Sequence, residues 1–180
     1  MMKLAIFPLG NPGDKYKRTR HNAARIVCLS IREACGLANA DIIIPDTYMN
    51  ESGSFVKNFI KNNKKNNSEI DFDKNKNVNN ILPIVMYDDK DLPWGDVKLS
   101  FGNSSGGHNG VQSVMDAIGK DFYRIRIGIG DPDIMPIYGE GVVQNYVMSN
   151  ITDREMKVLK SQTLQDKVVE ALSKIIKETA

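Results

Sequence analysis

The stretch that decides the fold is Leu4–Arg25, "LAIFPLGNPGDKYKRTRHNAAR", which has the pattern of a strand, a tight turn and the start of a helix. Its apolar beginning, over residues 3–9, is typical of a buried strand. A turn over Gly10–Gly13 follows, and apolar residues then recur at helical spacing from Ala23 until Gly36. A strand that leads directly into a helix is the repeating unit of α/β folds.

The rest of the chain continues this alternation. We predict further strands over "DIIIPD", "ILPIVMYDD", "DVKLSF" and "YRIRIGIG", with helices after Asn50, over "VQSVMDAIG" and in the terminal region. Thr152 and Glu155 form a T-x-x-E capping box, and an amphipathic pattern over Leu164–Ile176 continues the helical region. "DVKLSF" is expected to pair with "ILPIVMYDD". The pattern predicts a single-domain α/β/α sandwich over residues 1–180, with a twisted mixed sheet.

Composition places the protein among ordinary globular domains. The chain has 180 residues, 41% hydrophobic and 26% charged, and a net charge of +2 does not by itself indicate a nucleic-acid partner. Cys28 and Cys35 lie seven residues apart on one predicted helix, about 10 Å between Cα atoms, which is too far for a disulfide. Free thiols in the core, and the lack of an apolar run of about 20 residues, predict a cytoplasmic protein.

Residues 62–80 interrupt the pattern, because eight of these nineteen residues are Asn and four are Lys. So polar a segment buries too little surface to offset the entropy of ordering it. We predict an inserted surface loop, which is either a tolerated spacer or a basic loop that touches RNA.

Several polar residues directly follow predicted strands, where ligands collect in α/β folds. His21 begins a helix after the first strand-turn, and imidazole titrates near neutral pH, so it suits proton abstraction from water. Asp88 is the first acid after its strand and could fix the tautomer of His21. These two residues are the candidate catalytic pair.

Four asparagines occupy strand ends or helix starts, although this chain uses Asn freely: Asn11, Asn22, Asn50 and Asn109. A side-chain amide both donates and accepts hydrogen bonds. Several amides together could bind a peptide backbone, hold a water and donate to a developing oxyanion. The reaction that fits is attack of water on an activated acyl group.

Two other chemistries remain open. Asp88, Asp89 and Asp91 could hold Mg²⁺, although their spacing is not that of an EF-hand loop. A Ser-His-Asp triad would need Ser104 or Ser105 as nucleophile, and neither lies in a G-x-S-x-G elbow.

Taken together, "LGNPGDKYKRTRHNA", "PDTYMNESG", "YDDKDLPWG", "GGHNGVQSV" and "YRIRIGIGDP", in this order, resemble the bacterial peptidyl-tRNA hydrolase family. The resemblance covers nearly the whole chain except the Asn/Lys loop. It implies hydrolysis of the ester between a peptide and the 3′ end of tRNA, releasing tRNA for reuse in translation. It also implies a monomer with no metal and no cofactor.

The resemblance assigns roles residue by residue. His21 matches the general base, Asp88 the carboxylate that supports it, and Asn11 the position that distinguishes N-blocked peptide-like substrates, while Asn109 helps to place the water. The aromatic and basic residues that precede His21 are expected to meet RNA. The positions that match substrate or tRNA contacts are Tyr16, Asn22, Tyr48, Met49, Asn50, Lys98, Gly106, His108 and Arg126.

The chain also departs from the family's pattern. Pro8 and Ala24 stand where Gly is usual, and Ser100 stands where a phosphate-binding Lys is common. The connection before "IIIPDTYMN" is short, which predicts a sheet trimmed at one edge. A catalytically silent, splicing-factor-like RNA-binding relative is therefore an alternative, although RNA binding alone would not require the set His21, Asp88, Asn11 and Asn109.

Overall fold

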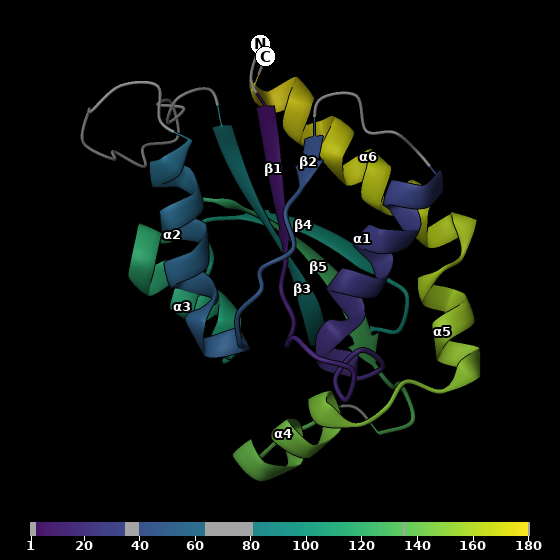
Figure 1. Ribbon diagram of the computed structural model, residues 1–180. Helices are drawn as coiled ribbons and strands as arrows, with labels where there is room; N and C mark the ends of the chain where they lie inside the picture. Colours follow the sequence, from purple (N-terminus) through teal and green to yellow (C-terminus); the bar gives the residue numbers. More distant parts are fainter. Residues whose placement is uncertain (1–2, 35–39, 64–80, 135, 180) are drawn as a thin grey trace.

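The computed structural model describes residues 3–34, 40–63, 81–134 and 136–179, which form one sheet covered by helices on both faces (Figure 1). The strands are β1 (Lys3–Pro8), β2 (Ala40–Ile42), β3 (Ile81–Pro93), β4 (Val97–Phe101) and β5 (Tyr123–Gly130). The helices are α1 (Ala23–Ala34), α2 (Ser52–Asn62), α3 (Asn109–Ile118), α4 (Glu140–Met148), α5 (Asp153–Leu159) and α6 (Gln162–Thr179). Two 3₁₀ turns precede α1 and α2: η1 (Arg20–Asn22) and η2 (Met49–Glu51).

Five strands are paired within the described residues, in the order β2-β1-β3-β5-β4, and β4 alone runs antiparallel. The predicted α/β/α sandwich with a mixed sheet is confirmed. β2 has three residues and ends the sheet at one edge.

The predicted pairing of the "DVKLSF" strand with "ILPIVMYDD" is wrong, because β5 lies between β4 and β3. A tight turn at Gly95 follows β3, and β5 packs closely against the end of β3 at Gly128. Only glycine fits there, because a Cβ on residue 128 would lie 2.0 Å from the Pro93 carbonyl oxygen. Ile125, Ile127 and Ile129 of β5 are fully buried, whereas no residue of β4 is, so β5 takes the central place and β4 the edge.

Each face of the sheet has its own apolar core. Ile125, Ile127 and Ile129 alternate onto the face covered by α1 and α6, as predicted, and all three are fully buried. The opposite face carries Phe7 and Val85 and packs against α2 and α3 (Figure 1). Because successive strand residues point to opposite faces, the two cores come from the same strands.

The terminal helices follow the predicted pattern with one exception. The Thr152–Glu155 capping box is formed, and it starts α5. Along α6, Leu164, Val168, Leu172 and Ile175 are buried, whereas Ile176 is 46% exposed. Ile176 lies about 100° around the helix from Ile175, which turns it away from the core.

Other sequence predictions fall partly outside the described residues. Asn62 ends α2 rather than beginning a loop, and residues 64–80 are not described, so the predicted surface loop stays untested. Cys28 is buried in the core as a free thiol, and Cys35 is not described. Across the part of the chain that is described, no helix is both long and apolar enough to traverse a bilayer.

Candidate active site

A cavity of about 1020 Å³ opens at the carboxyl ends of the parallel strands. It is bounded by the segment after β1, the end of β3, the Gly-rich turn before α3, and α4. Of the predicted site residues, those lining it are Asn11, His21, Met49, Asn50, Asp88, Gly106, His108, Asn109 and Arg126. Tyr16, Asn22, Tyr48 and Lys98 lie outside the lining.

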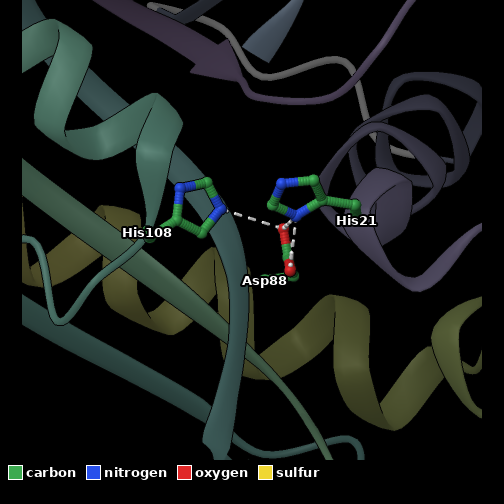
Figure 2. Close-up of side chains that lie close together, drawn as sticks. All are labelled: His21, Asp88 and His108. Carbon is green, nitrogen blue, oxygen red and sulfur yellow. Dashed lines mark hydrogen bonds and ion pairs between the residues drawn. The ribbon is translucent and has the colours of Figure 1, made fainter. Parts of the chain in front are cut away.

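His21 and Asp88 form a buried pair (Figure 2), and both residues line this cavity. His21 Nδ1 lies 2.9 Å from Asp88 Oδ2 and 3.0 Å from Oδ1. Burial alone would lower the pKa of His21, but the charge and hydrogen bond of Asp88 outweigh it and raise the pKa above its ordinary value. A carboxylate that fixes an imidazole in this way leaves Nε2 available as a base.

His108 approaches Asp88 from the opposite side (Figure 2). Its Nε2 lies 3.1 Å from Asp88 Oδ1, and its Nδ1 accepts a hydrogen bond of 3.2 Å from the backbone N–H of Val111, as the N-cap of α3. Burial would raise the pKa of Asp88, but His21 and His108 together lower it well below its usual range. Asp88 is therefore ionised and accepts from two imidazoles.

The side chain of Asn11 has a fixed orientation. Met49 N–H donates to Asn11 Oδ1 at 2.9 Å, and since a backbone N–H can only donate, the oxygen must occupy that position. The –NH₂ group is left for the cavity that Asn11 lines. Asn22 is buried, and both groups of its amide bind the Asn11 backbone, so this geometry favours a positioning role for Asn22 over direct substrate contact.

Asn50 and Asn109 are brought to one wall of the cavity by the close packing of α2 on α3. A Cβ on Gly53 would lie 1.9 Å from the Ser113 carbonyl oxygen, so the helices can approach this closely only with glycine there. The hydroxyl of Ser113 donates to the Asn50 carbonyl at 2.8 Å and accepts from Gly53 N–H at 3.0 Å. These contacts fix the two segments relative to each other.

The candidate tRNA-binding cations differ in availability. Arg126 lies opposite Lys98 in the β4–β5 register, on the strand face away from Ile125 and Ile127. The Arg126 side chain is 22% exposed and paired with Asp89, whereas Lys98 is exposed. Ser100 lines the cavity without supplying a charge.

Two tyrosines lie near the site without lining the cavity. The rings of Tyr16 and Tyr48 meet edge to face with centroids 6.3 Å apart, and Tyr48 is 50% exposed. Lys15 Nζ lies 4.6 Å from the centre of the Tyr16 ring. Because Tyr48 directly precedes Met49, this pair extends the site on the surface.

The basic residues before His21 were expected to contact RNA, but Arg20 is buried and its side chain is bonded within the protein. It donates to Glu155 at 2.7 Å and to the Asn150 carbonyl at 3.0 Å, and stacks on Tyr146 at 4.8 Å. Arg20 therefore joins η1 to the junction of α4 and α5.

The Mg²⁺ site and the Ser-His-Asp triad, the two alternatives left open by the sequence, find little support. Asp88 faces the two imidazoles, Asp89 pairs with Arg126, and Asp91 pairs with Lys90, so the three carboxylates do not converge. Among the hydrogen bonds of the described residues, neither Ser104 nor Ser105 has a hydroxyl bonded to His21. The His21, Asp88 and His108 ligand atoms do lie within 4.8 Å of one another, close enough to consider a metal ion.

The sequence patterns missed α4, which forms part of the cavity wall. The residues that it contributes are Glu140, Val143, Gln144, Val147 and Met148. Val143 and Val147, and Gln144 and Met148, are spaced four residues apart, and this periodicity is the signal that could have revealed the helix.

Comparisons with known proteins agree on one family. The family model described as peptidyl-tRNA hydrolase matches residues 5–180. A peptidyl-tRNA hydrolase of Thermodesulfovibrio yellowstonii is 37% identical over 194 residues, covering 96% of this chain and 90% of its own length. One of Sulfurihydrogenibium sp. is 38% identical, covering 86% and 82%. The crystal structure of peptidyl-tRNA hydrolase from Acinetobacter baumannii has the same fold, with a TM-score of 0.72 at 24% identity over 99% of this chain and 92% of that chain.

Proposed function

The chain belongs to the peptidyl-tRNA hydrolase family, and we propose that it cleaves the ester between a peptide and the 3′ end of tRNA with His21 as the general base. The buried His21–Asp88 pair at the cavity is the observation that carries this proposal. A silent RNA-binding relative is not supported, because the matched relatives are named as hydrolases and the pair is present.

The proposed reaction needs one base and one water. Since Nδ1–H of His21 donates to Asp88, Nε2 is unprotonated and takes a proton from water. The resulting hydroxide forms a bond to the ester carbonyl carbon. The bond from that carbon to the 3′ oxygen then breaks, and the imidazolium returns its proton to the departing oxygen. Asp88 stabilises the imidazolium between the two transfers without itself taking the proton.

Asn11 supplies the discrimination between substrates in this proposal. Its oxygen is occupied by Met49 N–H, so it offers only N–H donors to the cavity. A donor binds the carbonyl of an N-blocked aminoacyl group, but it repels the ammonium of a free aminoacyl ester. Asn50 and Asn109 would bind the peptide backbone from the wall that they share, with Asn109 also holding the attacking water.

The tRNA would lie across Lys98 and Arg126, with its terminal nucleotides at the Tyr16–Tyr48 pair. Lysine and arginine bind phosphates, and tyrosine rings stack on unpaired bases. Met49, Gly106 and His108 would shape the remaining wall. We further propose that the protein acts in the cytoplasm as a monomer, on peptidyl-tRNA and with no cofactor.

The test is single-turnover cleavage of N-acetyl-aminoacyl-tRNA by the wild-type protein, His21→Ala, and the surface control Asn58→Ala. Loss of the base should slow the chemical step by about 10²–10⁴-fold while tRNA affinity changes little, because only the transition state is affected. Asn58→Ala should match the wild type. Parallel loss of rate and affinity in His21→Ala would make His21 an RNA contact or a structural residue instead.

A further inference from the structure

His108 caps α3 through one ring nitrogen, and this contact determines where its proton lies. Nδ1 accepts the backbone N–H of Val111 at 3.2 Å. Since a peptide N–H donates and never accepts, Nδ1 carries no proton. A neutral imidazole has one N–H, which must then be at Nε2, 3.1 Å from Asp88 Oδ1. His108 is therefore a donor to Asp88.

We propose that His108 is a positioning residue, locked as the neutral Nε2–H tautomer by the first turn of α3, and that it acts on the reaction by orienting Asp88 against His21. This inference rests on the proposed function. The N–H donors run in a defined sequence: Val111 donates to His108, His108 donates to Asp88, and His21 donates to Asp88 from the other side. The helix terminus thereby helps to fix the orientation of the base.

The ring of His108 is held on both sides. Its centroid lies 4.9 Å from the Tyr87 ring and 4.8 Å from the His21 ring. The first turn of α3 is itself wedged against Met49, because a Cβ on Gly110 would lie 2.4 Å from Met49 Sδ. The position of His108 is therefore set by the same packing that places Asn11 and Met49.

The assignment changes two other interpretations of His108. Both ring nitrogens are occupied within the protein, which leaves no ring donor or acceptor for the substrate. Coordination of a metal by Nε2 would require the proton to move to Nδ1, where it would oppose Val111 N–H. The His21, Asp88 and His108 cluster is therefore better described as a hydrogen-bond network than as a metal site.

The charged groups around this network are few within the described residues. Asp89 is paired with Arg126 on the neighbouring strand, and Lys90 with Asp91 at the end of β3. Glu140 faces the cavity from α4. These groups remain in all variants below, so a change in pH dependence between variants reports on His108.

Two substitutions separate the two bonds of His108. In His108→Asn, the side-chain oxygen still reaches Val111 N–H as an N-cap, but the amide is too short for Asp88. In His108→Gln, the longer amide can donate to Asp88, while the cap is lost. If His108 only stabilised α3, activity would be kept in the variant that keeps the cap. In the proposed role, activity is kept in the variant that keeps the bond to Asp88.

We expect His108→Asn to keep a melting temperature near that of the wild type and to lose about 10–100-fold in kcat/KM, by analogy with the loss seen when groups that orient a metal-binding side chain are removed. The acid limb of its pH profile should move to higher pH, because Asp88 with one donor fewer holds the proton of His21 more strongly. His108→Gln should melt lower and return the acid limb towards the wild-type position.

An unshifted acid limb in His108→Asn would overturn the proposal, as would a change confined to KM, which would indicate substrate contact. ¹⁵N NMR of the imidazole at pH 8 gives a readout independent of activity: a proton on Nδ1 of His108 would also overturn it. Failure of the proposed function is distinguishable, because the wild-type protein itself would then not cleave the ester.

Discussion

Asn22 binds the backbone of Asn11 with both groups of its amide, accepting from Asn11 N–H at 2.8 Å and donating to the Asn11 carbonyl at 2.9 Å. The residue next to the proposed base thus fixes the turn that carries the proposed specificity residue. The proposed discrimination by Asn11 and the proposed proton abstraction by His21 therefore both depend on η1, which carries His21 and Asn22.

Asn22→Asp should therefore weaken discrimination as well as stability. The carboxylate can still accept from Asn11 N–H, but it faces the Asn11 carbonyl with no donor, so we expect a loss of about 1–3 kcal/mol in the free energy of unfolding. The preference for N-acetyl-aminoacyl-tRNA over aminoacyl-tRNA should fall. Urea denaturation and paired cleavage assays measure both effects, with the exposed Asn58→Asp on α2 as control. A loss of stability with an unchanged preference for N-acetyl-aminoacyl-tRNA would show that Asn22 does not influence substrate discrimination.

Asp88→Asn should change the pH profile in addition to the rate. The Asp88 charge raises the pKa of His21, so the wild-type acid limb of kcat/KM should lie above about 6.5, the ordinary value for histidine. Without that charge the limb should move to lower pH. The rate should fall by up to roughly 10⁴-fold, the loss seen when the orienting carboxylate of a Ser-His-Asp triad is replaced by an amide. An acid limb that stays in place would remove Asp88 from the pair.

The same pair should make stability depend on pH in two windows. The pKa of Asp88 is lowered in the folded state, so its contribution is present above its unfolded value near 3.9 and is lost as pH falls through the folded value. The pKa of His21 is raised, so its contribution is present below about 6.5 and is lost as pH rises through the folded value. Urea midpoints from pH 2 to 9 should therefore fall less in Asp88→Asn than in the wild type, both below about pH 4 and above about pH 6.5.

Cleavage of a minimal substrate, an N-acetyl-aminoacyl ester of the terminal nucleotide, should persist in millimolar chelator. This substrate avoids the need of folded tRNA for Mg²⁺. The proposed steps use only His21, Asp88 and water. Loss of activity that Zn²⁺ or Mg²⁺ restores would revive a metal site at His21, Asp88 and His108 or at the acidic residues that end β3.

Lys98→Ala should reduce the salt dependence of binding to full tRNA. Removing one cation–phosphate ion pair lowers the slope of log affinity against log salt by about 0.7–0.9. Arg126→Ala should lower it less than Lys98→Ala, because its guanidinium is already paired with Asp89. Lys174→Ala on α6, whose ammonium pairs with Glu170, is the control. The minimal ester should be cleaved normally by all three, and a slope equal to the wild type in Lys98→Ala would remove Lys98 from the tRNA surface.

Local patterns in the sequence predicted much of the fold. The alternation of Ile125, Ile127 and Ile129 identified β5 and its buried face, and the Thr152–Glu155 box marked the start of α5. The order of the strands could not be predicted in the same way. Whether β4 pairs with β3 or β5 depends on the close approach of Gly128 to Pro93, a contact between distant residues that periodicity does not encode.

In the candidate site, too, the sequence predicted the positions of residues better than their contacts. The convergence of Asn11, His21 and Asp88 follows from their common position towards the carboxyl ends of parallel strands. Asp88 was expected just after its strand, but it lies within β3, which continues to Pro93. The orientation of each side chain does not, because it depends on which backbone groups are left unpaired nearby. Val111 N–H decides the tautomer of His108, and Met49 N–H decides the rotation of the Asn11 amide. Similarly, the basic character of Arg20 gave no sign that it would be buried on Tyr146.

α4 supplies one wall of the cavity, although none of its residues is buried. It lies beyond the carboxyl ends of the strands (Figure 1), anchored near its end by Tyr146, while Tyr138 just before it is 74% exposed. So small an apolar contact implies a low free energy of local opening, and its amides should exchange with solvent well before those of β3 or β5. Residues of α4 can also change over evolutionary time with little effect on the folding of the sheet. Substitutions in α4 can therefore reshape one wall of the cavity while the proposed His21–Asp88 pair, held by the sheet and η1, stays in place.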